Sequence, residues 1–389
     1  MALATPLPTT QAAVKVTGPS TVDVSTGTTL PVLDASEVLV RVACVSINHV
    51  DGKSADMSPS PGATSGVDFS GIIVALGPEV GSDEFRADNN MKALSIGDRV
   101  FGGVFGNNPL RHDNGAFAEY VAVPARLIWH MPAAMDFSTA ATIGATLATV
   151  GLALFQYLRV PMPSTQTISE SKTTHSPQQK ARMALVYGGG TATGAMAIQV
   201  LKLAGFTPIT TCSAGSAARA KHLGAAATFD YRSPTCGADL REHTGNGLEL
   251  ALDCITDTAS MGICYEALGS AGGRYVALDA FPLRGHTRRS VAAEWVCTYT
   301  QFGHAVAWVP PYNLDARPRD REVAEAWYVV AQQLVDHGLI EPYPKEDRKG
   351  GLAAVGEGMR AVWKGEISGR KLAYPIAEEL CYGPTSIFT

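Results

Sequence analysis

The sequence predicts an α/β protein with two domains, one built on a doubly wound parallel sheet and one built on short strands. Three observations carry this prediction. A glycine-rich turn at 188–194 follows the apolar stretch 183–187, and further apolar runs alternate with helix-length segments down to residue 278. Short apolar stretches with frequent glycine fill the N-terminal part and indicate a compact, barrel-like domain. The 389 residues suffice for two cores.

The turn at 188–194 lies where a strand passes into a helix. The stretch 183–187 is apolar, and 195–204 continues as a helical segment. Glycine allows the backbone to approach a phosphate, and a helix N-terminus offers unpaired N–H groups to an anion. An ordinary strand-to-helix connection has the same appearance, so the turn alone is a weak signal. In a dinucleotide-binding domain the pyrophosphate would be bound by Gly190, Thr191, Ala192 and Thr193.

Apolar runs and helical segments alternate after the turn. This alternation is typical of βαβ units, and a helix at 322–335 would close the domain. Leu278 and Asp279 follow the fifth strand, and ligands bind at the carboxyl edge of such sheets, so we expect their backbone to face the nicotinamide. The predicted strands are 183–187, 207–212, 227–230, 248–254 and 273–278, and the predicted helices include 195–204, 216–223 and 258–268.

Hydroxyl and cationic side chains follow the second predicted strand. NAD-binding domains carry an acidic residue about 20 positions after the glycines, where it binds the ribose 2′-hydroxyl. Here the strand ends in Thr211, Cys212 and Ser213, with Arg219 and Lys221 beyond. Such residues suit a 2′-phosphate, so we predict NADPH as the cofactor. The phosphate would be bound by Ser213, Ala214, Gly215 and Ser216.

Composition argues against several classes of partner. The formal net charge is −5 and 17% of the residues are charged, so neither nucleic acid nor an anionic membrane is indicated. The stretch 138–158 is the most apolar, yet it contains Thr142, Thr146 and Gln156, and we predict a buried helix rather than a membrane span. Residues 1–14 lack the features of a secretory signal, and we expect a cytoplasmic protein.

Cysteine and histidine spacing predicts neither disulfides nor a metal site. The seven cysteines are dispersed and form no CxxC pair, which favours reduced thiols. His49, His112 and His130 lie in the N-terminal half without the spacing of metal ligands.

The N-terminal part contains predicted strands at 38–47 and 71–76, and strand-and-turn units at 97–102 and 115–120. A segment rich in Ser, Thr, Pro and Gln, 161–179, leads into the dinucleotide-binding part. Its composition cannot bury much apolar surface, so we expect a mobile loop.

Five motifs occur in the order and spacing of the medium-chain dehydrogenase/reductases, which the chain resembles over nearly its whole length. They are INHVD at 47–51, GVDFSG at 66–71, GDRVFG at 97–102, GAFAEY at 115–120 and TVGLAL at 149–154. The resemblance implies a GroES-like β-barrel domain at 1–159, completed by 339–389, and a Rossmann domain that binds NADPH at 160–338.

Two of these motifs depart from the zinc-dependent alcohol dehydrogenases. Those enzymes have cysteine where this chain has Asn48, and Gly-His-Glu where it has Gly66, Val67 and Asp68. The chain therefore resembles the zinc-free quinone oxidoreductase and enoyl reductase branch. Zinc would polarise a carbonyl. Without it, the resemblance implies an activated carbon–carbon double bond as the hydride acceptor.

A narrower set of motifs resembles the trans-acting enoyl reductases of fungal polyketide pathways, of the lovastatin-pathway type. This resemblance implies reduction of an α,β-unsaturated acyl thioester in secondary metabolism. The acyl chain would be carried by a separate iterative polyketide synthase, or by its hybrid with a nonribosomal peptide synthetase, and the reductase would be a monomer. The motifs are the segment 161–179, the turn 187–193, and 211–213, 229–232, 252–256 and 364–369.

The resemblance also implies site residues. Lys53 and Thr149 are the candidate catalytic residues: Lys53 would bind a ribose hydroxyl or lie near the developing enolate, and Thr149 would meet the carboxamide. Each has a plainer interpretation, since Lys53 could be a solvated lysine and Thr149 could bond its own helix carbonyl. The cofactor-binding residues implied beside those given above are Val50, Asp51, Gly52 and Lys53 at the nicotinamide end, Tyr231 at the adenosine, and Ile367 and Ser368 in a C-terminal segment returning to the first domain.

Two segments are implied as walls of an apolar groove for the acyl chain. Core packing is the plainer interpretation of the first, and both can hold because a helix has two faces. The residues are Thr149, Val150, Gly151, Leu152, Ala153, Leu154, Phe155 and Gln156 in the first segment, and Tyr299, Thr300, Gln301, Phe302 and Gly303 in the second.

Two other functions stay open at this point. A free-standing NADPH-dependent reductase of quinones or small enones would use the same fold and cofactor. A non-catalytic NADPH-binding protein would keep the fold alone.

Overall fold

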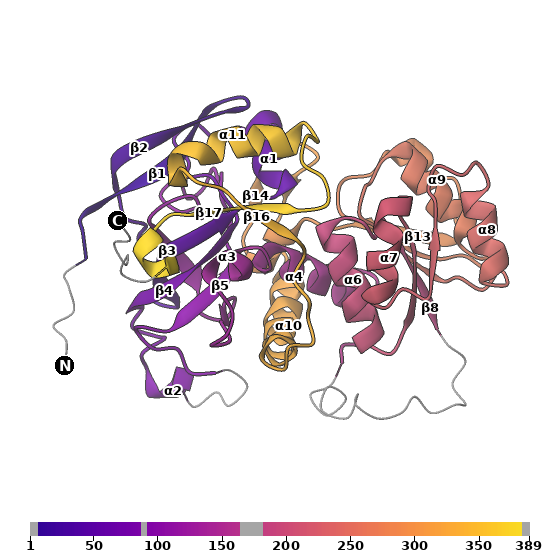
Figure 1. Cartoon of the computed structure of the whole chain (residues 1–389), viewed down its shortest axis with the longest axis horizontal. Coiled ribbons are helices and arrows are strands. Elements are labelled where there is room, and N and C mark those ends of the chain that lie inside the picture. Colours follow the sequence, from indigo (N-terminus) through magenta and orange to yellow (C-terminus); the bar gives the residue numbers. More distant parts are fainter. Residues whose placement is uncertain (1–6, 87–91, 164–181, 383–389) are drawn as a thin grey trace, which may run out of the picture. The chain divides into compact units, whose positions relative to one another are not determined.

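The computed structural model describes residues 7–86, 92–163 and 182–382, and its internal contacts divide the chain into two compact units (Figure 1). Unit 1 comprises Met1–Ala145, Val306–Leu314 and Pro344–Thr389, and unit 2 comprises Thr146–Ala305 and Asp315–Tyr343. The boundaries between the GroES-like and Rossmann domains that the resemblance implies, at 159/160 and 338/339, stay a prediction. Most of the predicted loop at 161–179 lies outside the described residues.

Unit 2 is built on a six-stranded sheet with the order β10-β9-β8-β11-β12-β13. All its strand pairs are parallel. The order reverses beside β8, as in a doubly wound sheet, and ligands bind where such a reversal occurs. The predicted parallel sheet is confirmed. Its strands are β8 (Met183–Tyr187), β9 (Thr207–Thr211), β10 (Ala227–Phe229), β11 (Leu250–Asp253), β12 (Gly273–Ala277) and β13 (Val291–Trp295).

Helices cover both faces of this sheet, α6 and α7 on one side and α8 and α9 on the other (Figure 1). Leu185, Ile209 and Tyr275 are fully buried in its core. The predicted closing helix is confirmed and is longer than expected. The helices of unit 2 are α6 (Ala192–Leu203), α7 (Ala214–His222), α8 (Cys236–His243), α9 (Thr258–Ala267) and α10 (Pro318–Asp336), with 3₁₀ turns η2 (Leu283–Gly285) and η3 (Thr298–Phe302).

Unit 1 contains a seven-stranded, mostly antiparallel sheet with the order β16-β17-β3-β4-β5-β7, and β6 pairs with β3. Strands β1 and β2 form a separate antiparallel pair, as do the short β14 and β15. The strands are β1 (Thr10–Gly18), β2 (Thr21–Thr29), β3 (Glu37–Ser46), β4 (Asp68–Leu76), β5 (Arg99–Gly103), β6 (Tyr120–Pro124), β7 (Trp129–His130), β14 (Val306–Ala307), β15 (Asn313–Leu314), β16 (Lys345–Asp347) and β17 (Lys371–Pro375).

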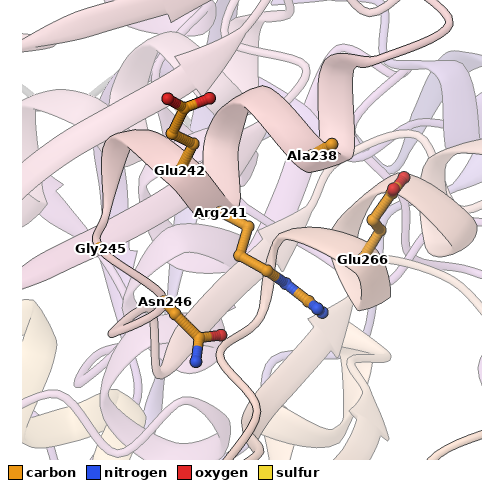
Figure 2. Close-up of a pocket in the computed structure, with 6 residues that line it drawn as sticks. All are labelled: Ala238, Arg241, Glu242, Gly245, Asn246 and Glu266. Atoms are coloured by element: carbon orange, nitrogen blue, oxygen red, sulfur yellow. The ribbon is translucent and has the colours of Figure 1, made fainter.

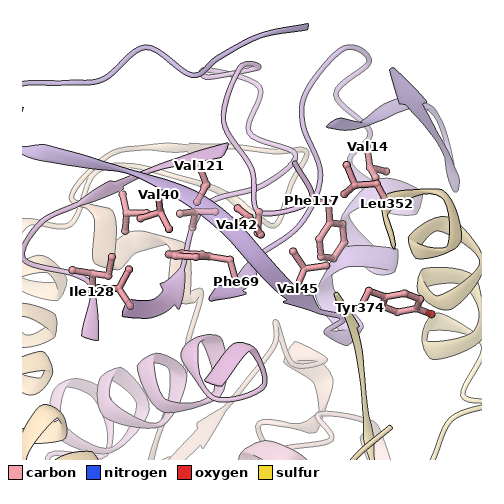
Figure 3. Packing of buried hydrophobic residues seen from close by; sticks show 14 of the residues in the cluster. Val14, Val40, Val42, Val45, Phe69, Phe117, Val121, Ile128, Leu352 and Tyr374 are labelled. Atoms are coloured by element: carbon pink, nitrogen blue, oxygen red, sulfur yellow. The ribbon is translucent and has the colours of Figure 1, made fainter. Parts of the chain in front are cut away.

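Alternating side chains of these strands form the core of unit 1. Figure 3 shows Val40, Val42 and Val45 of β3 near Phe69 of β4 and Tyr374 of β17. The helices α1 (His49–Met57), α2 (Asp83–Arg86), α3 (Phe137–Ala141), α11 (Gly351–Trp363) and α12 (Glu378–Tyr382) complete the unit.

In the predicted strand-and-turn unit at 115–120, residues 116–119 form bends and a single bridge between Ala118 and Ala13, and strand β6 begins at the last residue, Tyr120. The backbone at Gly115 packs closely on a neighbouring segment, because a Cβ there would lie 2.4 Å from the carbonyl oxygen of Thr64.

The apolar stretch expected as one helix at 138–158 is three helical pieces in succession: α3, α4 (Gly144–Gly151) and the π-helix η1 (Leu152–Tyr157). The Leu158 N–H donates to the carbonyl of Ala153, five residues back. Phe137–Tyr157 is long and apolar enough to cross a membrane, but 83% of its most apolar window is buried inside the structure. Such burial is typical of an internal helix, as expected.

Helix α1 packs so closely on α11 that residue 52 has no room for a side chain. A Cβ on Gly52 would lie 2.6 Å from Cβ of Trp363 and 3.0 Å from the carbonyl oxygen of Met359. Gly52→Ala should therefore lower the free energy of unfolding by about 1–3 kcal/mol. Gly262→Ala, in α9, is the control: it meets nothing within 4 Å and should stabilise by roughly 0.5–1 kcal/mol. Urea denaturation measures the free energy of unfolding of both variants. An equal change in Gly52→Ala and Gly262→Ala would contradict the close packing of α1 on α11.

Candidate functional site

The glycine turn of unit 2 forms a closed backbone loop ahead of α6. Gly188 has φ +90°, which favours glycine, and its N–H and that of Gly189 donate to the carbonyl of Thr211 at the end of β9. The hydroxyl of Thr191 donates to the Gly188 carbonyl (2.8 Å) and accepts from the N–H of Gly194 (3.0 Å). Thr191 thus caps α6, whose first-turn N–H groups point to a site for an anion.

The N-terminus of α7 lies beside this turn. Ser213 is its N-cap, makes no capping bond with its side chain, and has its hydroxyl 3.3 Å from that of Ser216. A Cβ on Gly190 would lie 2.7 Å from the Ser216 hydroxyl oxygen. The structure therefore brings the residues predicted for the pyrophosphate and for the 2′-phosphate together at the ends of β8 and β9.

Arg219 serves this site indirectly. Its guanidinium donates to the carbonyl of Pro342 (3.0 Å) and lies over the ring of Tyr343, 5.1 Å from the centroid. The Tyr343 hydroxyl donates to the carbonyl of Gly190 (2.5 Å). Sequence reasoning missed Tyr343, because it is 153 residues from its partner and belongs to no motif. Lys221 is exposed.

Tyr231 and the residues after β12 occupy the same edge of the sheet. Tyr231 is 38% exposed, and its ring centroid is 6.4 Å from that of Tyr187 at the end of β8. The Leu278 N–H donates to the carbonyl of Asp253, and the Asp279 carboxylate accepts from the N–H of Ala280. Their proposed contacts with the cofactor stay predictions.

In unit 1, helix α1 carries the residues predicted for the nicotinamide end, Val50–Lys53. Asn48 is its N-cap, and the Asp51 carboxylate accepts from the Asn48 N–H (2.7 Å) in a capping box. Asp51 is only 2% exposed, so any contact with a cofactor would come from its backbone. The Lys53 ammonium lies 4.4 Å from the centroid of the Tyr312 ring, a cation–π distance.

The pKa of Asp51 is raised to about 8, chiefly by burial and with a smaller contribution from the Asp68 carboxylate, while the hydrogen bond from the Asn48 N–H and the charge of Lys371 act in the opposite direction. One of its oxygens, Oδ1, is buried without a hydrogen-bond partner. A carboxyl in such surroundings is stabilised in its protonated form.

A lysine joins Asn48 and Asp68, which belong to the two motifs that depart from those of the zinc-dependent alcohol dehydrogenases. Lys371 Nζ lies 2.6 Å from Oδ2 of Asp68 and 2.9 Å from Oδ1 of Asn48. Within the described parts of the chain, no group of three or more His, Cys, Asp or Glu side chains could hold a metal ion. The sequence reading missed Lys371, although a lysine opening the fully buried strand β17 is a signal that could have pointed to it.

The two segments predicted as acyl-groove walls belong to unit 2 and meet at Thr149. Its hydroxyl lies 2.9 Å from that of Thr298, at the start of η3. Of the predicted wall residues, Thr149, Gln156 and Gly303 are partly exposed and the others are buried. Gly151 and Phe155 pack on Trp327 of α10. Core packing thus accounts for the buried members, and substrate contact by any of them stays a prediction.

A buried carboxylate on α10 holds both segments. Asp320 is 2% exposed and accepts from Tyr157 (2.7 Å), Gln156 (3.2 Å) and Thr300. Arg317 donates to the Tyr157 hydroxyl (2.6 Å), so the guanidinium and carboxylate charges are bridged by a phenol. Neighbouring residues of an α-helix point about 100° apart. Gln156 and Tyr157, neighbours in the π-helix η1, nevertheless both reach one carboxylate through their long side chains.

Ile367 and Ser368 differ in exposure. Ile367 is half-buried against the core of unit 1, and Ser368 is exposed. Their predicted contact with the cofactor is untested by this placement.

An open cavity of about 460 Å³ lies on unit 2, between α8 and α9. Figure 2 shows Arg241, Glu242 and Glu266 around it. None of the predicted site residues lines it, and we assign it no part in the site.

Comparison with known proteins matches both units. Residues 34–133 match the family described as "Alcohol dehydrogenase GroES-like domain", and residues 192–289 match "Zinc-binding dehydrogenase". The chain is 93% identical over 382 residues to the trans-enoyl reductase iliB of Neonectria sp. (strain DH2), covering 98% of this chain and 100% of that protein. It is 70% identical to the trans-enoyl reductase iccB of Talaromyces variabilis, covering 96% and 98% of the two chains.

Among solved structures, an alcohol dehydrogenase superfamily protein from Novosphingobium aromaticivorans has a TM-score of 0.71 at 22% identity, covering 94% of this chain and 99% of that one. The CurK enoyl reductase has a TM-score of 0.68 at 14% identity with the same coverage. At these identities the likeness concerns the fold, and it confirms the predicted fold class.

The raised pKa of Asp51 predicts how stability depends on pH. Because the folded-state pKa is about 8 against an ordinary 3.8, the folded protein binds the proton more tightly than the unfolded one. The free energy of unfolding should therefore fall by a few kcal/mol as pH rises from about 4 to about 8. Asp51→Asn keeps an oxygen for the cap, so its stability relative to the native protein should rise across this window. Urea denaturation at about pH 5, 7 and 9 measures this, and parallel curves would contradict it.

Proposed function

The chain belongs to the trans-enoyl reductases of the medium-chain dehydrogenase/reductase superfamily, and from that premise we propose that it reduces an α,β-unsaturated acyl thioester with NADPH. The observation that carries the proposal is the juxtaposition in unit 2 of the Thr191-capped helix and the Ser213–Ser216 hydroxyl pair. These are groups suited to a pyrophosphate and to a further phosphate.

The chain's own residues fit NADPH. The missing side chain of Gly190 leaves room beside Ser216, and the end of β9 carries Thr211, Cys212 and Ser213 without a carboxylate. Asp230, at the end of the neighbouring strand, accepts from the backbone of Arg232 (3.0 Å) and lies 3.8 Å from its guanidinium. That carboxylate is compensated, so a 2′-phosphate at Ser213 would meet little repulsion.

When bound, a reduced nicotinamide supplies the hydride that adds to the β carbon of the acyl thioester. The protein would hold the reactants close to their reacting geometry, with Thr149 orienting the carboxamide. In unit 1 the Lys53 ammonium would stabilise negative charge that develops on the thioester oxygen. Its place over the Tyr312 ring limits the freedom of a long side chain, which favours such a role over that of a solvated lysine.

The substrate would arrive on a partner. The relatives are trans-enoyl reductases, and we propose that this enzyme acts in trans on an acyl chain carried by an iterative polyketide synthase or by its hybrid with a nonribosomal peptide synthetase. We further propose that the enzyme is cytoplasmic and monomeric.

An assay with purified protein separates this function from its rivals. Oxidation of NADPH should depend on an enoyl thioester such as a crotonyl pantetheine thioester, with kcat/KM well above that for a benzoquinone. Faster turnover of the quinone would favour a free-standing quinone reductase. NADPH binding without oxidation in either case would favour a non-catalytic protein.

Ser213→Asp should change the cofactor preference. Aspartate is a good N-cap, so α7 should persist, but its charge would oppose a 2′-phosphate. We expect the ratio of NADPH to NADH affinity to fall roughly hundredfold, since like charges brought together cost several kcal/mol and about 1.4 kcal/mol is a factor of ten. Fluorescence titration measures both affinities. Ser213→Asn, of equal size and neutral, is the matched control, and an equal fall in that variant would refute the electrostatic reason.

A further inference from the structure

A buried lysine connects three elements of unit 1. Lys371 opens β17, Asp68 opens β4, and Asn48 caps α1. Beyond the two bonds from Lys371, the side-chain amide of Asn48 donates to Oδ2 of Asp68 (2.8 Å). The other oxygen of Asp68 accepts from the N–H of Ala145 (2.5 Å). Lys371 is 6% exposed and Asp68 is fully buried, so the three side chains form a closed polar cluster, the Asn48–Asp68–Lys371 cluster.

Stability alone is a poor explanation for this cluster. Burying an ammonium and a carboxylate costs desolvation energy that their attraction often fails to recover. The neighbouring strand shows the ordinary alternative: Lys345, in register with Lys371, lies 2.7 Å from Asp347 with both side chains partly in solvent. The Asn48–Asp68–Lys371 cluster differs because its charged pair is buried and because it includes the N-cap of α1, which points to a positional role.

The cluster fixes where α1 begins. Both ends of the Asn48 amide are engaged, its oxygen by Lys371 and its nitrogen by Asp68, so the residue has one orientation. From there α1 runs against α11, with Gly52 in contact distance of Trp363, and delivers Lys53 over Tyr312. The ammonium of Lys371 thus restrains the start of the helix four residues before Gly52 and five before Lys53.

We propose that Lys371 is a positioning residue: its ammonium holds Asn48 and Asp68 together and thereby sets the position of Lys53. The inference rests on the proposed enoyl reduction, to which Lys53 contributes. Lys371 touches neither substrate nor cofactor in this account, and it acts through α1.

The test compares four proteins: the native chain, Lys53→Met, the neutral-pair variant Asp68→Asn/Lys371→Met, and the three changes combined. The neutral pair leaves no buried charge unpaired, so it should fold. Its kcat with a crotonyl pantetheine thioester should fall roughly tenfold to hundredfold, as displacement of a group by about 1 Å can do. In the Lys53→Met background the same pair should cause no further loss, because the residue that it positions is gone.

Two further variants make the result decisive. Lys345→Met removes the partly exposed lysine in register with Lys371 and should leave kcat unchanged. Asn48→Ser keeps a good N-cap but removes both amide contacts, and it should lower kcat like the neutral pair, again without effect in the Lys53→Met background. If thermal unfolding shows that the neutral-pair variant is not folded, Asn48→Ser takes its place in the test.

The inference would be overturned if the neutral pair lowered kcat by the same factor with and without Lys53→Met. It would also be overturned if the neutral-pair variant kept the kcat of the native protein. These results differ from a failure of the proposed function itself, in which the native chain would not oxidise NADPH with the thioester at all.

Discussion

The candidate cofactor site of unit 2 depends on the backbone geometry of the turn after β8, which decides how closely an anion can approach the first turn of α6. Gly188 in the left-handed region, the donation of two N–H groups to Thr211, and the Thr191 cap place the first turn of α6 next to the ends of β8 and β9. Tyr343 closes the same loop from a distant part of the chain. The candidate site is therefore made mainly by backbone geometry, and in the proposed function the hydroxyls of Ser213 and Ser216 would favour a nucleotide with a 2′-phosphate.

In unit 1, buried charged side chains fix the position of the helix that carries the candidate site residues, whereas in unit 2 backbone geometry does so. A buried ammonium–carboxylate pair and one amide set the start of α1, and the absence of a side chain at Gly52 sets its distance from α11. Burial raises the pKa of a second carboxyl, Asp51, to about 8, which favours its protonated form beside the charged pair.

Most of the parallel sheet could be predicted from the sequence because its signals are local: β8 matches its predicted range, and the other four predicted strands differ by one or two residues at their ends, whereas the edge strand β13 is not predicted. The start of the strand in the 115–120 unit could not be predicted, because strand pairing in unit 1 joins residues that are far apart in the sequence. The π-helix, Asp320, Tyr343 and Lys371 escaped for a related reason: Lys371 is 303 residues from Asp68, and no spacing rule joins such partners. The sequence shows such a residue only as a polar side chain within an apolar run, and it does not reveal which distant residue is its partner.

In the proposed reaction this protein directs hydride from NADPH to the β carbon of an enoyl thioester. Reduction with NADPH carrying deuterium at the transferable position, followed by NMR of the saturated thioester, tests this most directly. We expect one deuterium on the β carbon and solvent hydrogen on the α carbon. Deuterium on the α carbon, or a saturated product without deuterium, would contradict it.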